Sequence, residues 1–160
     1  MDDIQIRWLI RRDMDEVLHI ERESFDYPWT EDDFLSCLRQ RNAIRLVAEK
    51  GFRSKDYMIV GFIVFEIHAR LLNIANFAVS KDYRRNGVGT KIVHRMKGKL
   101  SIERRVRLTL NVRETNLPSQ LFFQSCGFMA TGIVRNPYEY CSEDAISMEY
   151  RIEAGQLQST

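Results

Sequence analysis

The chain has 160 residues, of which 44% are hydrophobic and 29% charged, a length and composition that suit one globular domain with a real core. Its 24 basic and 22 acidic residues leave a net charge of +2, which argues against a dedicated nucleic-acid-binding domain, because such domains are usually strongly basic on one face. No apolar run approaches the ~20 residues of a membrane span, and the acidic start does not resemble a signal peptide, so we expect neither a membrane anchor nor a secretory leader.

Cysteine and histidine usage excludes two further classes of site. The cysteines are odd in number and show neither a disulfide framework nor a metal-binding CxxC pair; they are Cys37, Cys126 and Cys141. The three histidines lack the HExxH spacing of a zinc site. We therefore expect no metal, and a reducing cytoplasm as the location.

The first half of the chain alternates between strand and helix patterns. Residues 4–10 alternate apolar and polar side chains and predict an opening strand. Asp13, with Glu16 three residues later, has the pattern of a capping box at a helix start. Thr30 follows Pro28 and precedes three acidic residues, which predicts the start of a second helix. Three apolar runs of strand length come next, at 43–50, 57–69 and 70–79.

The second half begins with a change of period at Gly87, after which apolar residues recur at helical spacing. Residues 105–112 alternate again as a strand. Asn116 opens another helix as its N-cap, and Gly127 stands where a left-handed C-cap would close it. Two further strands are expected at 128–135 and 145–152.

The order of these elements, βααβββαβαββ, mixes hairpins with crossovers. Such an order predicts an α/β (α+β) fold in which helices cover a mixed sheet. We expect a single domain over residues 1–153, followed by a flexible C-terminal tail at 154–160.

One segment, VSKDYRRNGVGTKI at residues 79–92, joins a strand to a helix through two arginines and two glycines. A glycine turn that feeds a helix exposes main-chain N–H groups at the positive end of the helix dipole, which favours an anion. The P-loop pattern is absent, and Ile92 stands where a dinucleotide fingerprint needs its last glycine. What remains is Arg84-x-x-Gly87-x-Gly89; taken alone, it also fits a solvated glycine turn.

In its strand–turn–helix setting, this pattern resembles the acetyl-CoA signature of the GNAT superfamily of N-acetyltransferases. Four blocks, which are spread over most of the chain, look like the ribosomal-protein alanine acetyltransferases of that superfamily. They are HIERESFDYPWTEDDF (19–34), NFAVSKDYRRNGVG (76–89), VRETN with LFFQSCGF (112–116 and 121–128), and RNPYEYCSEDAISM (135–148).

The resemblance implies an enzyme, an acyltransferase that moves acetyl from acetyl-CoA to a protein N-terminal α-amine. Its partner would be a protein or peptide N-terminus, with ribosomal proteins among the implied acceptors, and neither nucleic acid nor membrane. The implied fold is a mixed, mostly antiparallel seven-stranded sheet flanked by about four helices.

The resemblance also implies roles for particular residues. Main-chain groups of one strand end would hold the acetyl-pantetheine arm: Phe77, Ala78 and Val79. The motif and the residues after it would hold the pyrophosphate: Arg84, Arg85, Asn86, Gly87, Val88, Gly89 and Thr90. Further cofactor contacts would come from Asn116, which also suits an N-cap, and Phe123. A loop would form the wall of the peptide-acceptor cleft: Tyr27, Pro28 and Trp29. Trp29 equally fits a hydrophobic staple ahead of the second helix.

The catalytic residues are where the chain departs from the family. A glutamate base and a tyrosine acid often stand where this chain has Asn111 and Phe123. The side chain of Asn111 could orient the amine or a water, and Tyr138 is our candidate proton partner and a substrate contact, although it also fits a loop aromatic packed over the sheet edge. Glu23 and Glu66 are other carboxylates that the fold could bring near the amine.

The pKa of the acceptor decides how much these departures matter. An α-amine has a reference pKa near 7.7–8.0, so roughly a tenth is neutral at pH 7, against about one lysine amine in 2,500. General acid–base assistance contributes typically ~10²–10⁴-fold. The missing groups are therefore expected to slow α-amine acetylation without abolishing it.

Three other functions stay open at this point. The chain could acetylate a free small amine, or it could be a catalytically weak acyl-CoA-binding module, which the residues at 111 and 123 make credible. A ribosome- or RNA-surface protein that uses the basic stretch at 103–107 fits less well, because a solvated surface accounts for those charges.

Overall fold

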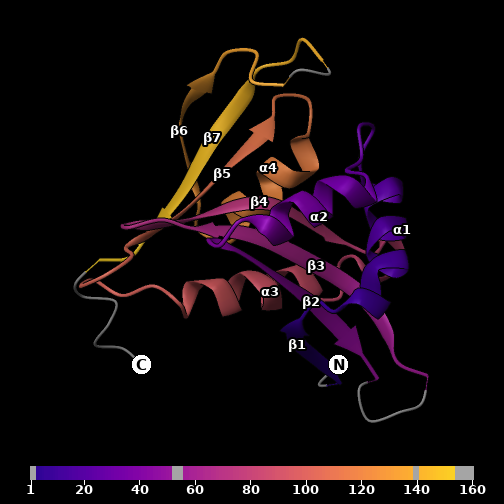
Figure 1. The fold of residues 1–160 in the computed structure, drawn as a ribbon. Helices are drawn as coiled ribbons and strands as arrows, with labels where there is room; N and C mark the ends of the chain where they lie inside the picture. Colours follow the sequence, from indigo (N-terminus) through magenta and orange to yellow (C-terminus); the bar gives the residue numbers. More distant parts are fainter. Residues whose placement is uncertain (1–2, 52–55, 139–140, 154–160) are drawn as a thin grey trace. The chain divides into compact units, whose positions relative to one another are not determined.

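The computed structural model describes residues 3–51, 56–138 and 141–153, so the predicted tail at 154–160 lies outside the described residues. The strands found in this part of the chain are β1 (Ile4–Trp8), β2 (Ala43–Lys50), β3 (Met58–Ile67), β4 (Leu71–Val79), β5 (Arg107–Arg113), β6 (Met129–Val134) and β7 (Ala145–Arg151). The helices are α1 (Met14–Ser24), α2 (Glu31–Arg39), α3 (Val88–Lys97) and α4 (Leu117–Ser125), with short 3-10 helices η1 (Arg11–Asp13) and η2 (Lys81–Tyr83) (Figure 1). The predicted order of elements is confirmed.

The strands form one seven-stranded sheet in the order β1-β2-β3-β4-β5-β7-β6. β1 and β2, β2 and β3, β5 and β7, and β6 and β7 pair antiparallel. β4 and β5 pair in parallel, through Leu71 to Asn73. The prediction of a mixed, mostly antiparallel seven-stranded sheet with four α-helices is therefore confirmed.

The chain divides into two compact units. The first comprises the described residues within Met1–Glu66 and Asn76–Arg95, and the second those within Ile67–Ala75 and Met96–Thr160. Strand β4 contributes its beginning to the second unit and its end to the first. The single domain over residues 1–153 stays a prediction.

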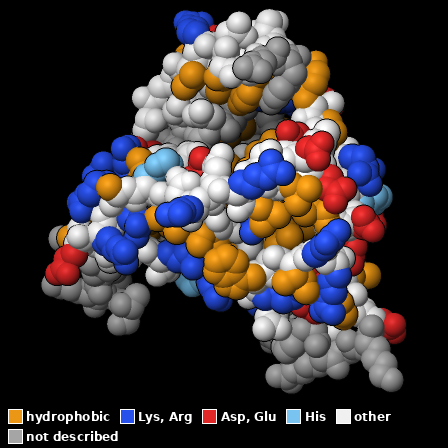
Figure 2. Space-filling model, in the orientation of Figure 1, with side chains coloured by type: hydrophobic (Ala, Val, Ile, Leu, Met, Phe, Trp, Pro, Cys, Tyr) orange, Lys and Arg blue, Asp and Glu red, His pale blue; other side chains and the backbone are white. Residues whose placement is uncertain are grey.

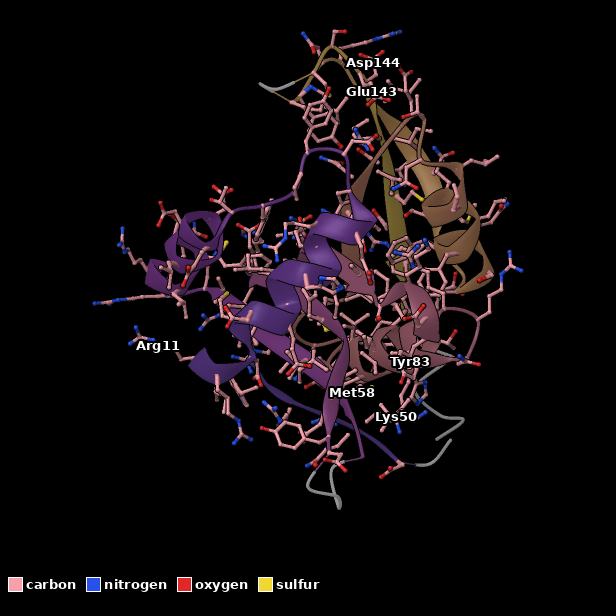
Figure 3. The ribbon with its side chains drawn as sticks, turned by 90° about the vertical axis from the view of Figure 1, so that its right-hand side faces the viewer. Arg11, Lys50, Met58, Tyr83, Glu143 and Asp144 are labelled. Atoms are coloured by element: carbon pink, nitrogen blue, oxygen red, sulfur yellow. The ribbon has the colours of Figure 1, made fainter. Side chains whose placement is uncertain are left out.

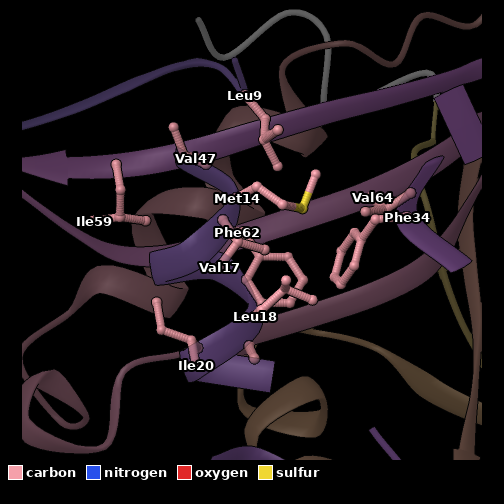
Figure 4. Close-up of a cluster of buried hydrophobic side chains, with 11 residues drawn as sticks. Leu9, Met14, Val17, Leu18, Ile20, Phe34, Val47, Ile59, Phe62 and Val64 are labelled. Carbon is pink, nitrogen blue, oxygen red and sulfur yellow. The ribbon is translucent and has the colours of Figure 1, made fainter. Parts of the chain in front are cut away.

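In the first unit, helices α1 and α2 pack on one face of the sheet (Figure 4). Val17 of α1, Phe34 of α2, Val47 of β2 and Phe62 of β3 are all fully buried in this cluster. Burial of this apolar surface is the main force that holds the two helices to the strands.

Helix α3 packs on the opposite face of the same strands, and Gly61 marks the contact. Successive side chains of a strand point to opposite faces, so Gly61 faces away from Phe62. A Cβ at Gly61 would lie 3.2 Å from Ile92 Cδ1 and 3.4 Å from Val88 Cγ1. The missing side chain lets α3 come close to the sheet directly behind the end of β4.

Of the two caps predicted in the first unit, the one at the start of α2 is present and the one at the start of α1 is not. Thr30 caps α2: its hydroxyl accepts from the Asp33 N–H, and the Asp33 carboxylate accepts from the Thr30 N–H. The capping box predicted at Asp13 is wrong. Asp13 makes no side-chain cap; its buried carboxylate instead accepts from the Arg7 guanidinium at 2.7 and 2.9 Å.

In the second unit, α4 packs through a row of aromatic rings. Asn116 is its N-cap and accepts from the Ser119 N–H at 3.3 Å. Gly127, at φ 92°, closes it in the left-handed region, as predicted. Phe123 packs edge-on against Phe128, with ring centroids 5.2 Å apart, and Phe128 packs on Tyr150.

Candidate active site

The loop between β4 and α3 has the backbone of an anion site. Arg85 and Gly87 both adopt the left-handed region, with φ of 66° and 81°, and α3 begins directly afterwards at Val88. Alternating conformations of this kind turn successive N–H groups toward one point, and a helix N-terminus adds its positive dipole end. A Cβ at Gly87 would meet no atom within 4 Å, so a glycine is needed there for its backbone angle and not for space.

Arg84, the first residue of the motif, braces this loop. Its Nε donates to the Val79 carbonyl and its Nη2 to the Ser24 hydroxyl, each at 3.0 Å. These bonds join the loop to the end of β4 and to the last residue of α1. Arg84 therefore positions the backbone around the anion site, while its charge still adds to the positive field there.

Tyr83, at the end of η2, joins the loop to strands β2 and β3. Its hydroxyl lies 2.8 Å from Met58 Sδ, and the Lys50 ammonium lies 4.8 Å from its ring centroid. Figure 3 shows the three side chains together, with Lys50 and Met58 coming from β2 and β3. The loop is thus fastened to the β2–β3 hairpin as well as to α1.

The end of β4 presents main-chain groups to an edge of the strand. The Ser80 N–H donates to Val60 O of β3 at 2.8 Å, and main-chain groups of alternate residues point to the same edge of a strand. The N–H and C=O of Phe77 and Val79 are therefore directed away from β3. There the Phe77 N–H bonds to Asn76 Oδ1 at 2.8 Å, and the Val79 carbonyl accepts from Arg84. The Val79 N–H points to the same edge, where an amide-containing arm could continue the ladder.

The loop before α2 combines an exposed ring with a packed one. Tyr27 is 47% exposed. The ring of Trp29 packs edge-on against Phe34, with centroids 5.1 Å apart, and these residues stand on the two sides of the Thr30 cap. The hydrophobic staple is confirmed, while the acceptor contacts predicted for Tyr27, Pro28 and Trp29 stay predictions.

Helix α1 carries two carboxylates that accept hydrogen bonds from the loop before α2, from the end of β4 and from η2. Glu21 accepts from the Trp29 N–H and from Asn76 Nδ2, each at 2.9 Å. Glu23 accepts from the Lys81 N–H at 2.9 Å. One helix thus contacts the loop before α2, the end of β4 and the start of the anion loop.

Sequence reasoning missed Glu21 and Asn76. Glu21 is 1% exposed and Asn76 8%, and burial raises the pKa of the Glu21 carboxyl although both hydrogen bonds oppose the rise. The signal was available: Glu21 continues the apolar stripe of Met14, Val17 and Leu18 on α1. A charge at such a position is rarely buried without a partner.

The predicted catalytic residues lie in the second unit. Asn111 is exposed on β5, and its Oδ1 accepts from the Ser147 hydroxyl of β7 at 3.0 Å. Phe123 is 3% exposed within the aromatic row of α4, so its ring has a packing role, and its predicted cofactor contact stays a prediction. Asn116 holds the N-cap described above, which leaves its second role open as well.

Tyr138 is partly buried in the loop between β6 and β7, of which residues 139–140 lie outside the described residues. Asp144 fixes this loop: it accepts from Arg135 and from the Asn136 N–H, each at 2.9 Å. Glu143 accepts from Arg113 at 3.1 Å and from Thr115. Figure 3 labels both carboxylates at the end of the β6–β7 region. The loop that carries Tyr138 is thus held at its base to the end of β5.

Charged side chains of both signs lie on the surface of the described residues (Figure 2). Lys and Arg side chains share the visible face with Asp and Glu (Figure 2). In the described part of the chain, no three His, Cys, Asp or Glu side chains gather as metal ligands would. None of the described helices is long and apolar enough to span a membrane.

Comparison with known proteins places this geometry in a family. The model of the acetyltransferase (GNAT) family matches residues 14–128. A Bacillus subtilis protein, named as a candidate ribosomal protein bS18-alanine N-acetyltransferase, is 33% identical over 145 residues, 89% of this chain and 92% of its own length. The Escherichia coli ribosomal protein bS18-alanine N-acetyltransferase is 28% identical over 138 residues, 85% of this chain and 89% of its own. A crystal structure of the ribosomal-protein-S18-alanine N-acetyltransferase from E. coli superposes with a TM-score of 0.78 at 26% identity, over 94% of each chain. The chain belongs to the acetyltransferase (GNAT) family, and it is an N-acetyltransferase that takes its acetyl group from acetyl-CoA.

Proposed function

We propose that this enzyme acetylates the α-amine of a protein N-terminus, with a ribosomal protein that begins with alanine as the first acceptor to test. The similarity to bS18-alanine N-acetyltransferases over 85–89% of the chain carries this proposal. A ribosomal acceptor would place the reaction in the cytoplasm.

We assign the pyrophosphate of acetyl-CoA to the loop from Arg85 to Thr90. The left-handed turn at Arg85 and Gly87 and the N-terminus of α3 support this assignment. The arm that carries the acetyl group would continue the β4 ladder at Phe77 and Val79. This arrangement leaves the thioester beside the edge of β4, where the acceptor must arrive.

The acceptor's own chemistry supports an α-amine over a lysine. Deprotonation of a lysine amine at pH 7 costs about 3–4 kcal/mol more than that of an α-amine. Asn111 and Phe123 cannot accept or supply a proton, so an acceptor that needs little deprotonation suits this chain. Positioning of two bound reactants would supply most of the rate acceleration.

In the proposed reaction, the neutral α-amine attacks the thioester carbonyl and the thiolate of coenzyme A leaves. A thiolate whose conjugate acid has a pKa of ~8.5 departs with little help. Asn111 would orient the acceptor, and the Tyr138 hydroxyl would exchange the proton that the amine loses and the thiolate gains. Main-chain N–H groups near the thioester would stabilise the oxyanion.

The test is an acetyl-transfer assay with matched peptides. The protein is incubated with acetyl-CoA and an alanine-initiated peptide whose N-terminus is free or blocked, while thiol release and peptide mass are followed. We expect release only with the free N-terminus. Release with a small amine but neither peptide would identify the small-amine enzyme instead.

Asn111 and Phe123 favour one second candidate, a weak acyl-CoA-binding module. The same assay separates it, because a binding module retains acetyl-CoA by calorimetry but releases no thiol with any acceptor. Turnover on the free peptide excludes it.

A further inference from the structure

Glu21 is a buried carboxylate that accepts on both sides. Oε1 accepts from the Trp29 main-chain N–H and Oε2 from the Asn76 amide, each at 2.9 Å, and the side chain is 1% exposed. On its far side, Asn76 accepts from the Phe77 main-chain N–H at 2.8 Å. A continuous path of hydrogen bonds therefore runs from Trp29 through Glu21 and Asn76 to Phe77.

The direction of every bond in this path is set by its two ends. Main-chain N–H groups can only donate, so the group beside Trp29 and the group beside Phe77 must both accept. Asn76 satisfies Phe77 with its oxygen and then has only its NH₂ to offer Glu21. Position 21 must accept from both neighbours, which a carboxylate does and a side-chain amide does not.

The two ends of the path belong to the two segments that we propose bind the substrates. Trp29 lies in the loop predicted to contact the acceptor, immediately before the Thr30 cap of α2. Phe77 lies at the end of β4, where the acetyl-bearing arm is predicted to bind. Both ends, and the two side chains between them, belong to the first compact unit.

We propose that Glu21 is a positioning residue for acetyl transfer. Through Trp29 and Asn76 it fixes the distance and orientation between the loop before α2 and the end of β4. The proposal rests on the function proposed above, which gives these two segments their substrates. Their relative position matters because a displacement of about 1 Å between bound reactants can cost ~10²-fold in rate.

The test exchanges the two polar groups. In Glu21→Gln, the NH₂ of the new amide faces a donor in either orientation. In Asn76→Asp, two carboxylates oppose each other. In the double variant Glu21→Gln/Asn76→Asp, the new amide at position 21 accepts from Trp29 and donates to the new carboxylate at position 76, which still accepts from Phe77. The exchange restores every bond while it moves the charge from position 21 to position 76.

We expect each single variant to lower kcat on the peptide by at least about tenfold, and the double variant to return within about threefold of the starting enzyme. Thermal unfolding confirms that each variant is folded at the assay temperature. If the single variants unfold at lower temperature but keep kcat and both KM values, Glu21 has a purely structural role and the proposal is overturned. Failure of a folded double variant to recover overturns it as well.

Amide hydrogen exchange separates this proposal from the function proposed above. We expect acetyl-CoA to slow exchange of the Trp29 N–H in the starting enzyme and in the double variant, but not in Glu21→Gln. This readout needs no acceptor. If the protein does not acetylate the peptide but acetyl-CoA still slows exchange at Trp29, the proposed acceptor is wrong and the coupling through Glu21 stands. If acetyl-CoA does not alter exchange at Trp29, the coupling is overturned.

Discussion

At the scale of single residues, a hydrogen bond from β7 determines which polar group Asn111 can offer a substrate. The Ser147 hydroxyl donates to Oδ1 of Asn111, so the amide NH₂ is the group that Asn111 can offer a substrate. That group donates, which suits a carbonyl oxygen of the acceptor peptide or a water, and it cannot take a proton from an amine. A glutamate at this position could still accept from Ser147 while it gains a basic oxygen.

Asn111→Glu should therefore raise kcat at pH 7 on the free N-terminal peptide by about 10–100-fold, since general-base assistance is worth ~10²–10⁴. Asn111→Gln, of the same length but without the charge, is the matched control and should bring no gain.

Tyr138→Phe should lower kcat by about tenfold or more. Steady-state kinetics check these variants, and an unchanged rate for Tyr138→Phe would remove the proton role from that residue.

At the scale of elements, the β4–α3 connection depends on backbone geometry more than on side chains. Gly87 has room for a Cβ but a φ of 81° that L-residues rarely adopt. Arg85 adopts a similar angle despite its side chain. One such residue is tolerated at a cost of order 1 kcal/mol, and a second would add to it.

Gly87→Ala should destabilise the fold by about 1 kcal/mol and weaken acetyl-CoA binding by about tenfold or more, because a relaxed turn misdirects the N–H groups. Gly132→Ala is the matched control: it also has open space around its Cβ, without a left-handed angle, and should leave the affinity unchanged. Calorimetric titration with acetyl-CoA checks both. Equal affinities for the two variants would contradict the role of the turn.

The difference between Thr30 and Asp13 shows which elements the sequence could predict. The Thr30 cap uses partners within three residues, so a local pattern was enough. Asp13 had an equally good local pattern, but Arg7 takes its carboxylate, and β1 places that arginine there. Glu21 has partners 8 and 55 residues away, and no local pattern carries that information.

At the scale of the whole molecule, the order of strands and helices was predictable because hydrophobic period and glycine positions are local signals. The glycine motif likewise predicted the turn between β4 and α3, since such a turn depends on backbone angles that only a few residues adopt. The bracing of that loop by Arg84, Tyr83 and Glu23 was not predictable, because each bond joins distant elements. The sequence therefore predicted the glycine turn before α3 but not the contacts that hold it.

One partly buried ion-pair cluster in the first unit, in which Arg7 bonds to Asp13 and Glu49, links the stability of the fold to pH. Burial alone would raise the pKa of Asp13, but the hydrogen bonds from Arg7 and from the Ile10 N–H outweigh it and lower the pKa below its ordinary value. A depressed carboxyl pKa stabilises the fold above the unfolded pKa of ~3.9, and this stability is lost as pH falls through the folded pKa.

Arg7→Met should leave Asp13 buried without its charged partner. We expect a loss of about 2–3 kcal/mol at pH 7, less than the ~3–5 kcal/mol of a fully buried pair because Arg7 is partly exposed, and acid unfolding that begins at higher pH. Arg135→Met, whose ion pair with Asp144 is mostly exposed on the arginine side, should cost less than about 1 kcal/mol. Urea unfolding between pH 3 and 7 measures both. Identical pH profiles would contradict the assignment.

The packing of Trp29 gives the molecule a built-in optical reporter. The chain has two tryptophans, and Trp8 is 58% exposed on β1, so Trp8→Phe would leave a single indole beside the Thr30 cap. Its emission would then follow the segment that Glu21 holds. Arrival of an acceptor peptide could be timed by stopped-flow fluorescence, without any label on either molecule.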